Sequence, residues 1–150
     1  MTFICTSFNG LSLEWLYEIM RLRQEVFVVE QACAYLDADG QDQASFHLMA
    51  FDENEKIIGY VRLLPKGLTY EKYPSIGRVA VALQARGTGA GKLLMKEALK
   101  QAGLLFFNVS IKISAQCYLI RFYEHLGFSV VGEEYLEDGI PHIGMVFGQD

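Results

Sequence analysis

ARGTGAGKL, residues 85–93, carries three glycines at alternate positions, with Arg86 before them and Lys92 after them. The apolar segment SIGRVAVAL precedes this stretch, and LLMKEALKQ, which favours a helix, follows it. A helix N-terminus offers unpaired backbone N–H groups and the positive end of the helix dipole, and glycine lets an anion approach those groups closely. The stretch therefore predicts a phosphate-binding turn between a strand and a helix.

Two well-known phosphate-binding turns require residues that this stretch lacks. A nucleotide P-loop would need glycine at Arg86 and serine or threonine at Leu93. A dinucleotide-binding turn beginning at Gly87 would need glycine at Lys92. A third pattern fits residues 86–91: arginine or glutamine, two intervening residues, glycine, one residue, and then glycine or alanine.

A second motif lies downstream in QCYLIRFYEHLGF, residues 116–128, where Tyr123 stands four residues before Gly127. In this order and at this separation, the two motifs resemble the coenzyme A signatures of the GNAT superfamily of N-acetyltransferases. The resemblance covers residues 57–146. The segments RQEVFVVEQ, DADG and EDGIPHIGM are similar to the ElaA-like branch of the superfamily, which extends the resemblance over nearly the whole chain.

The hydrophobic pattern predicts the element order β, α, β, β, β, α, β, α, β, β. Ser12 is expected to cap the first helix, which begins at about residue 13 and continues into residues 26–30. Gly103 is expected to end the second helix and Gly127 the third. The residues expected to form the apolar face of the first helix, away from most of its charges, are Leu13, Leu16, Tyr17, Met20 and Phe27.

These elements predict an α/β (α+β) layer fold in which helices cover a largely antiparallel sheet. The resemblance implies a GNAT-like fold, whose central mixed and mostly antiparallel sheet is splayed between the fourth and fifth strands, with helices on both faces. Residues 1–150 are expected to form a single domain, because no linker or repeat divides the chain and its length suits one core.

Composition and charge disfavour several other classes of protein. The net charge of −5 argues against binding to nucleic acid or to an anionic membrane surface. The three cysteines form no C-x-x-C pair, so we expect neither a metal site nor a disulfide framework. Without a signal-peptide pattern or a long apolar segment, the protein is expected to be cytoplasmic.

The resemblance implies that acetyl-CoA is the cofactor and that CoA is the product. The pantetheine arm of the cofactor would pair with the backbone of Val79, Ala80 and Val81, and the side-chain amide of Gln116 would bond to the same arm. The residues implied to hold the pyrophosphate, mainly through backbone amides, are Arg86, Gly87, Thr88, Gly89, Ala90, Gly91 and Lys92.

The implied reaction is direct attack of an amine on the acetyl thioester, without a cysteine nucleophile. Tyr123 is the expected general acid, which protonates the leaving thiolate. Some superfamily members carry a glutamate early on the fourth strand, but this chain has SIGR at residues 75–78. Glu30, Glu134 and His142 are therefore the candidates for the base or the amine site, acting directly or through water.

We therefore expect an acetyl-CoA-dependent N-acetyltransferase acting on a primary amine of a small molecule or peptide. One alternative is a different acyl donor, as in acyl-homoserine-lactone synthases, which LRQEVFVVEQ and GYVRLL faintly resemble; another is a non-catalytic CoA-binding module. Neither the acceptor nor the oligomeric state can be read from the sequence, and a homodimer is one alternative. Arg62 and Arg78 interrupt apolar strands, and we expect them to pair with the acidic loop at residues 37–42 or with Glu30; the alternative is that they bind an acidic part of the acceptor.

Overall fold

The computed structural model describes residues 1–148, in which seven strands form one sheet in the order β1-β2-β3-β4-β5-β7-β6. The strands are β1 (Thr2–Ser7), β2 (Phe46–Phe51), β3 (Ile57–Leu64), β4 (Ser75–Val81), β5 (Ile111–Gln116), β6 (Phe128–Glu137) and β7 (Ile140–Phe147). The α-helices are α1 (Leu13–Arg23), α2 (Ala90–Leu105) and α3 (Ile120–His125). The predicted order of strands and α-helices is confirmed.

Five short helical segments join these elements. A π-helix, η2 (Gln24–Glu30), continues α1, and the remaining four are 3-10 helices: η1 (Phe8–Gly10), η3 (Asp42–Ala44), η4 (Leu83–Ala85) and η5 (Cys117–Leu119). None of the helices in residues 1–148 combines the length and the apolar character needed to span a bilayer.

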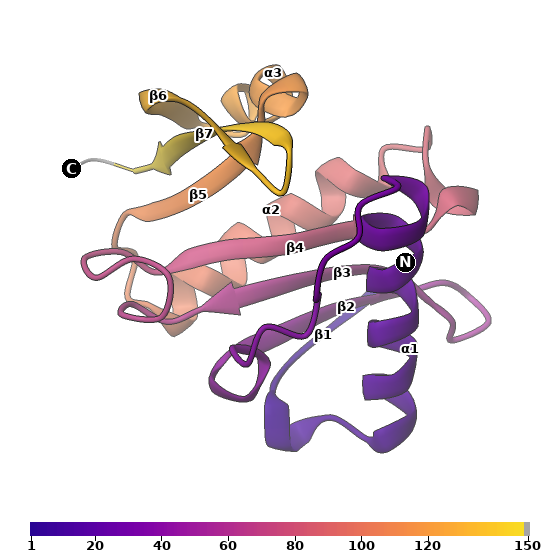
Figure 1. Cartoon of the computed structure of the whole chain (residues 1–150). Helices are drawn as coiled ribbons and strands as arrows, with labels where there is room; N and C mark the ends of the chain where they lie inside the picture. Colours follow the sequence, from indigo (N-terminus) through magenta and orange to yellow (C-terminus); the bar gives the residue numbers. More distant parts are fainter. Residues whose placement is uncertain (149–150) are drawn as a thin grey trace.

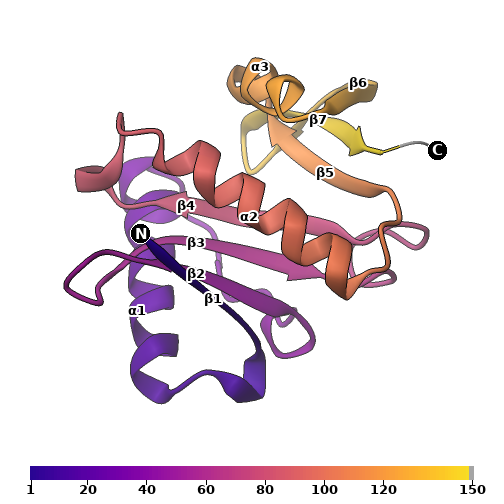
Figure 2. The same ribbon diagram turned by 180° about the vertical axis from the view of Figure 1, so that it is seen from behind.

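Helices cover both faces of the sheet, with α1 on one face and α2 on the other (Figures 1 and 2). Successive residues of a strand point to opposite faces, so β2 supplies Leu48 and Ala50 to the core under α2, and Met49 and Phe51 to the core under α1. Because both faces are covered, β2 is buried along nearly its whole length. This arrangement confirms the predicted layers.

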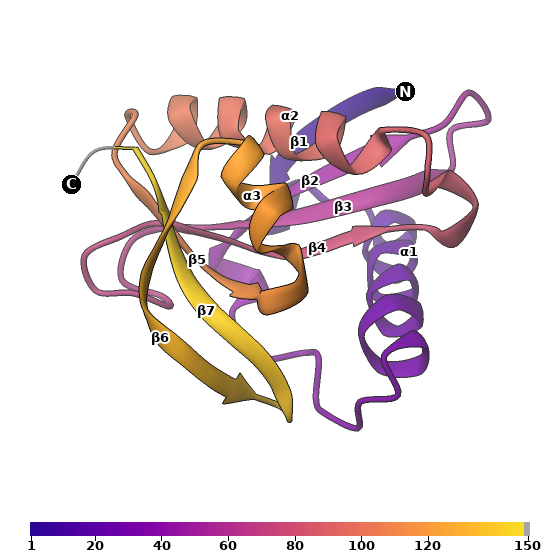
Figure 3. The same ribbon diagram turned by 90° about the horizontal axis from the view of Figure 1, so that it is seen from above.

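β4 and β5 are the parallel pair in an otherwise antiparallel sheet, and they are joined at one end only. Their register contains the single pair Ser75 and Lys112, beside which the Lys112 N–H donates to the Pro74 carbonyl at 3.0 Å. Beyond this point the two strands diverge, and Figure 3 shows β5 and β7 turning away from β4. The predicted splay between the fourth and fifth strands is therefore confirmed.

The apolar face predicted for the first helix is only partly correct, since Phe27 packs against the core under α1 while two of the other predicted residues are exposed. Leu13 is 87% exposed and Tyr17 is 68% exposed, whereas Ile19, Leu22 and Arg23 are buried. The helix carries two apolar stripes at helical spacing, and periodicity alone does not choose between them. The choice is made by the core under α1 and by acidic groups that compensate the buried charge of Arg23.

The predicted helix ends are partly correct. Gly127 has a φ of +106° and follows Leu126, the C-cap residue of α3, as expected of a glycine beyond a helix C-terminus. Gly103, in contrast, lies inside α2, which continues to Leu105. The stop predicted at Gly103 is wrong because Ala102, next to it, is buried in the core, and packing there keeps the last turn helical.

Candidate active site

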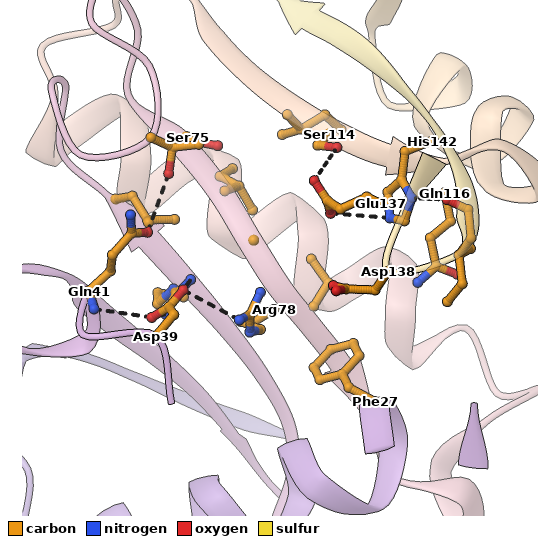
Figure 4. A pocket seen from close by; sticks show the side chains of 18 of the residues that line it. Phe27, Asp39, Gln41, Ser75, Arg78, Ser114, Gln116, Glu137, Asp138 and His142 are labelled. Atoms are coloured by element: carbon orange, nitrogen blue, oxygen red, sulfur yellow. Dashed lines mark hydrogen bonds and ion pairs between the residues drawn. The ribbon is translucent and has the colours of Figure 1, made fainter. Parts of the chain in front are cut away.

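A cavity of about 440 Å³ opens where β4 and β5 separate (Figure 4). Its walls come from η2 and the loop after it, from β4 and β5, from α3, and from the β6–β7 turn. The sequence-predicted residues that line it are Val79, Gln116, Tyr123 and His142. Those that lie outside its lining are Glu30, Ala80, Val81, Glu134 and residues 86–92.

Tyr123 reaches the cavity from α3 and is only 7% exposed. The rings of Phe122 and Phe128 pack edge-on against it, with centroids 5.2 and 5.6 Å away. Burial, and secondly Tyr118, raise the pKa of Tyr123 to about 12. Tyr123 is therefore a neutral phenol at neutral pH, which is the form that can donate a proton.

His142 lies on β7, is 6% exposed, and presents one ring nitrogen to the cavity. Its Nδ1 is 2.7 Å from the Ile140 carbonyl oxygen. A carbonyl oxygen can only accept, so we assign the proton of the neutral ring to Nδ1, which leaves the lone pair on Nε2. This lone pair lies 3.5 Å from a carboxylate oxygen of Glu137. His142 is thus arranged to accept a proton at Nε2.

Side chains from β5 and β6 surround this imidazole of β7. The Tyr135 ring stacks on it with centroids 6.2 Å apart, and the Tyr135 hydroxyl is hydrogen-bonded to Ser114 on β5. The Ser114 hydroxyl donates to Glu137 at 3.5 Å. The sequence pointed to neither Ser114 nor Glu137. The segment Glu137-Asp138-Gly139 is typical of a hairpin turn, and it was the signal that could have placed Glu137 near His142. A two-residue turn there puts Tyr135 opposite His142.

The two glutamates proposed as bases from the sequence have other surroundings. Glu30 forms a bidentate ion pair with Arg86, whose guanidinium also donates to the Val81 carbonyl at 3.0 and 3.1 Å. The hydrogen bond from Arg86 lowers the pKa of Glu30, which makes this carboxylate a poorer proton acceptor. Glu134 is an exposed residue of β6 outside the cavity lining.

The loop before α2 has the geometry expected of an anion site. Gly87 and Gly89 have φ values of +76° and +84°, and no atom lies within 4 Å of where a Cβ would stand at either position. Leu93 is the first residue whose N–H reaches back to a helix carbonyl, that of Gly89 at 3.2 Å. The N–H groups of residues 90–92 precede it and are free to bind an anion. The loop therefore fits the pyrophosphate of CoA.

Other groups along the predicted CoA path are also placed by the fold. The Thr88 hydroxyl donates to the Ala85 carbonyl at 2.6 Å and so braces the loop. The edge of β4 that faces the splay is not paired with β5 beyond Ser75, which leaves room for an extended chain beside it. The Gln116 side chain contacts that of Gln31 at 3.4 to 3.5 Å, linking β5 to the segment after η2.

A network of three arginines and three aspartates, four of them buried, supports the wall of the cavity. Arg62 pairs with Asp39 and Asp42, and Arg78 pairs with Asp37 and Asp39. This confirms that these two arginines bind the acidic loop, and Glu30 is not their partner. The third arginine is Arg23, which binds Asp37 and Asp42 at 2.8 Å and which the sequence pattern had placed on a polar face.

Arg78 reaches the loop because β4 is irregular at this residue. The register of β3 and β4 shifts between the pairs Tyr60–Ala80 and Arg62–Gly77, and Arg78 has a φ of +51°. Such a bulge re-aims a side chain and bends the strand. Burial opposes the charge of Asp39, but hydrogen bonds from Arg62 and the Gln41 N–H lower its pKa to about 2. Asp39 is therefore a carboxylate at neutral pH.

The splayed sheet and the glycine loop at the start of α2 agree with the comparisons to known proteins. The acetyltransferase (GNAT) domain family matches residues 18–148, and the chain belongs to this family. More narrowly, the chain is similar to Escherichia coli ElaA, whose crystal structure superposes with a TM-score of 0.91 at 35% identity, covering 99% of this chain and 100% of that one. The resemblance to the ElaA-like branch is thereby confirmed.

Two further proteins are similar over nearly the whole chain. The crystal structure of an acyl-CoA N-acyltransferase from Pseudomonas aeruginosa has a TM-score of 0.90 at 41% identity, covering 99% of this chain and 100% of that one. A UPF0039 protein of Synechocystis is 42% identical over 140 residues, which are 93% of this chain and 90% of that protein. The GNAT-like fold is confirmed, and with it acyl transfer as the general activity of the family.

Proposed function

We propose that this protein is an acetyl-CoA-dependent N-acetyltransferase that moves an acetyl group directly to a primary amine of a small molecule or peptide. The observation that supports this proposal is the cavity at the splay, where Tyr123 of α3 and His142 of β7 line one space. A proton donor and a proton acceptor at the point where the family binds its thioester are what aminolysis needs.

The acetyl donor, acetyl-CoA, would lie along the open edge of β4. The N–H groups of residues 87–92 would hold its pyrophosphate at the positive end of the α2 dipole. Its pantetheine arm would follow the backbone of Val79, Ala80 and Val81, with the Gln116 amide as a further partner. The acetyl thioester supplies the carbonyl carbon that the amine attacks, and a β4 N–H would stabilise the oxyanion.

The proton steps would be divided between the two cavity residues. His142 Nε2 would take one proton from the acceptor ammonium, directly or through water, which frees the nitrogen lone pair for attack. When the carbon–sulfur bond breaks, Tyr123 would protonate the departing thiolate, and the second proton that the nitrogen loses as the amide forms would return to the Tyr123 phenolate through water, so that the products are an amide and CoA. Among the three candidate bases, His142 is the one whose lone pair lies at the cavity wall, whereas Glu30 is held by Arg86 and Glu134 lies outside.

Isothermal titration with acetyl-CoA and with CoA tests the donor site directly. We expect both to bind, and we expect acetyl-CoA to release free thiol when a primary amine is added. Failure of both compounds to bind at millimolar concentration would contradict the proposal.

Two further outcomes separate the alternatives. A preference for longer acyl-CoA or acyl-carrier thioesters would identify another acyl donor. Binding of CoA without turnover on any of a broad panel of amines would instead favour a non-catalytic binding module.

A further inference from the structure

Glu137, the last residue of β6, holds its carboxylate at the point where His142 and Ser114 also face the cavity (Figure 4). One carboxylate oxygen is 3.5 Å from His142 Nε2 and the other is 3.5 Å from the Ser114 hydroxyl. With Nδ1 donating to Ile140, the neutral ring has its lone pair on Nε2, and that atom has no closer partner within the described residues. Two acceptors of hydrogen bonds, one of them on a residue that is 6% exposed, therefore converge on the same space.

Two acceptors that face each other repel unless a donor lies between them. A primary ammonium group has three N–H donors and a positive charge. Among the common forms of an amine that accepts an acetyl group, it is the one that can donate hydrogen bonds to a carboxylate and to an imidazole lone pair together. Water would supply the donors without the charge. The arrangement therefore favours a cationic ligand atom over a neutral one.

The cationic side chains near the cavity already bind other groups of the protein. Arg62 and Arg78 line it, but each binds two aspartates of the arginine–aspartate network. The Lys112 ammonium lies over the rings of Tyr70 and Tyr73, at 4.9 and 5.9 Å from their centroids. In residues 1–148, His142 is the one basic side chain found within 4 Å of the Glu137 carboxylate. Glu137 thus keeps a negative charge available to a ligand.

We propose that Glu137 is the specificity-determining residue for the acceptor, and that it binds the amine in its protonated form beside His142. This inference rests on the proposed function and adds to it the subsite of the amine. The bound ammonium transfers one proton to His142 Nε2, and the nitrogen keeps the electron pair of that N–H bond for attack. The imidazolium then faces the Glu137 carboxylate, which compensates its charge until the proton leaves to solvent.

The first experiment measures turnover of Glu137→Gln with a primary alkylamine. We expect the KM for the amine to rise roughly tenfold or more, because a charge-assisted hydrogen bond is lost, while the dissociation constant of acetyl-CoA stays unchanged. Glu137→Asp should recover part of the loss. Glu133→Gln, on the same strand and also exposed, is the matched control and should behave as the wild type. An unchanged KM in Glu137→Gln, or a fall in kcat alone, would overturn the proposal.

The second experiment does not depend on acetyl transfer. Calorimetry compares n-hexylamine, which is protonated at neutral pH, with n-hexanol, which has the same chain and no charge. We expect the wild type to bind the ammonium roughly tenfold more tightly, and Glu137→Gln to bind the two about equally. Equal binding by the wild type would overturn the inference, whereas failure of acetyl-CoA to bind would count against the proposed function alone.

Discussion

At the scale of single residues, Tyr123 combines burial with access to the cavity. Removing its hydroxyl leaves a ring that the neighbouring phenylalanines still hold. We therefore expect Tyr123→Phe to lower kcat roughly 100-fold or more, the usual contribution of a general acid, with little change in CoA binding. The measurement is kcat for thiol release, beside calorimetry with CoA. Tyr17→Phe, on the exposed face of α1, is the control, and a kcat equal to that of the wild type would exclude Tyr123 as the acid.

Arg23 and Arg21 stand two residues apart on α1 and differ in what surrounds them. The Arg23 guanidinium is fully buried between Asp37 and Asp42, so Arg23→Met leaves two carboxylates without this partner. We expect a loss of about 3–5 kcal/mol in the free energy of unfolding, measured by urea titration.

Arg21→Met is the matched control for this change. The side chain of Arg21 is 49% exposed, and its ion pairs with Glu18 and Glu25 lie on the surface. We expect its loss to change the free energy of unfolding by less than about 1 kcal/mol. Equal effects of the two substitutions would show that the arginine–aspartate network does not stabilise the fold.

At the scale of elements, the start of α2 is determined by glycine. Gly89 precedes the helix in a left-handed conformation, which costs a residue with a Cβ about 1 kcal/mol. The Cβ of Gly89→Ala would also occupy the open space in front of the α2 amides. We expect this substitution to weaken CoA binding roughly tenfold in a calorimetric titration.

Gly67→Ala separates backbone strain from obstruction of the anion site. Gly67 also has a positive φ, +100°, and open space around its Cβ position, but it lies in the loop between β3 and β4. The Gly67→Ala variant should lose about as much free energy of unfolding as Gly89→Ala and should keep its affinity for CoA. If both alanine variants bind CoA as the wild type does, the α2 loop is not the pyrophosphate site.

The elements themselves were predictable to different degrees. Strands and helices follow the hydrophobic period, and the loop pattern before α2 identified the start of that helix. The buried face of α1 was mistaken because two apolar stripes have the same helical period, and only the core beneath α1 selects Ile19 and Leu22. A buried Arg23 cannot be expected from local pattern, since its partners lie 14 and 19 residues away.

At the scale of the whole molecule, stability should decrease in acid in two steps. Burial lowers the pKa of His47, so below its ordinary value of about 6.5 the unfolded chain binds a proton that the folded chain resists. The pKa values of Asp39 and Asp42 are also lowered, the former to about 2. Their contribution is complete above the unfolded value of about 3.9 and is lost as the pH falls towards 2.

Urea midpoints measured between pH 7.5 and pH 2.5 test this expectation. We expect a first decline below about pH 6.5 and a steeper one below about pH 4. Asp39→Asn should flatten the second step, whereas Asp138→Asn, at the exposed β6–β7 turn, should leave it unchanged. A midpoint that is constant down to pH 3 would show that these groups do not govern stability.

The site was predictable only where its residues belong to local motifs. The glycine loop and Tyr123 each stand in a short pattern, and His142, a candidate base by residue type, lines the cavity. Ser114 was missed because its relation to His142 runs between β5 and β7, whereas the hairpin turn after Glu137 was a local signal that could have placed Glu137 near His142. The bulge between Val131 and Tyr135 also shifts the register of that hairpin, and no local signal gives its size.

The sequence by itself determined the family and the order of elements, and it singled out the glycine loop and Tyr123, because each depends on residues close together along the chain. The tertiary structure alone decided which face of α1 is buried, how three arginines and three aspartates pair with one another, and that His142, Glu137 and Ser114 line the same cavity as Tyr123. These outcomes depend on where strands separate and how far side chains reach across the splay. The hydrophobic period and the spacing of motifs along the chain do not give the distances between side chains on different strands.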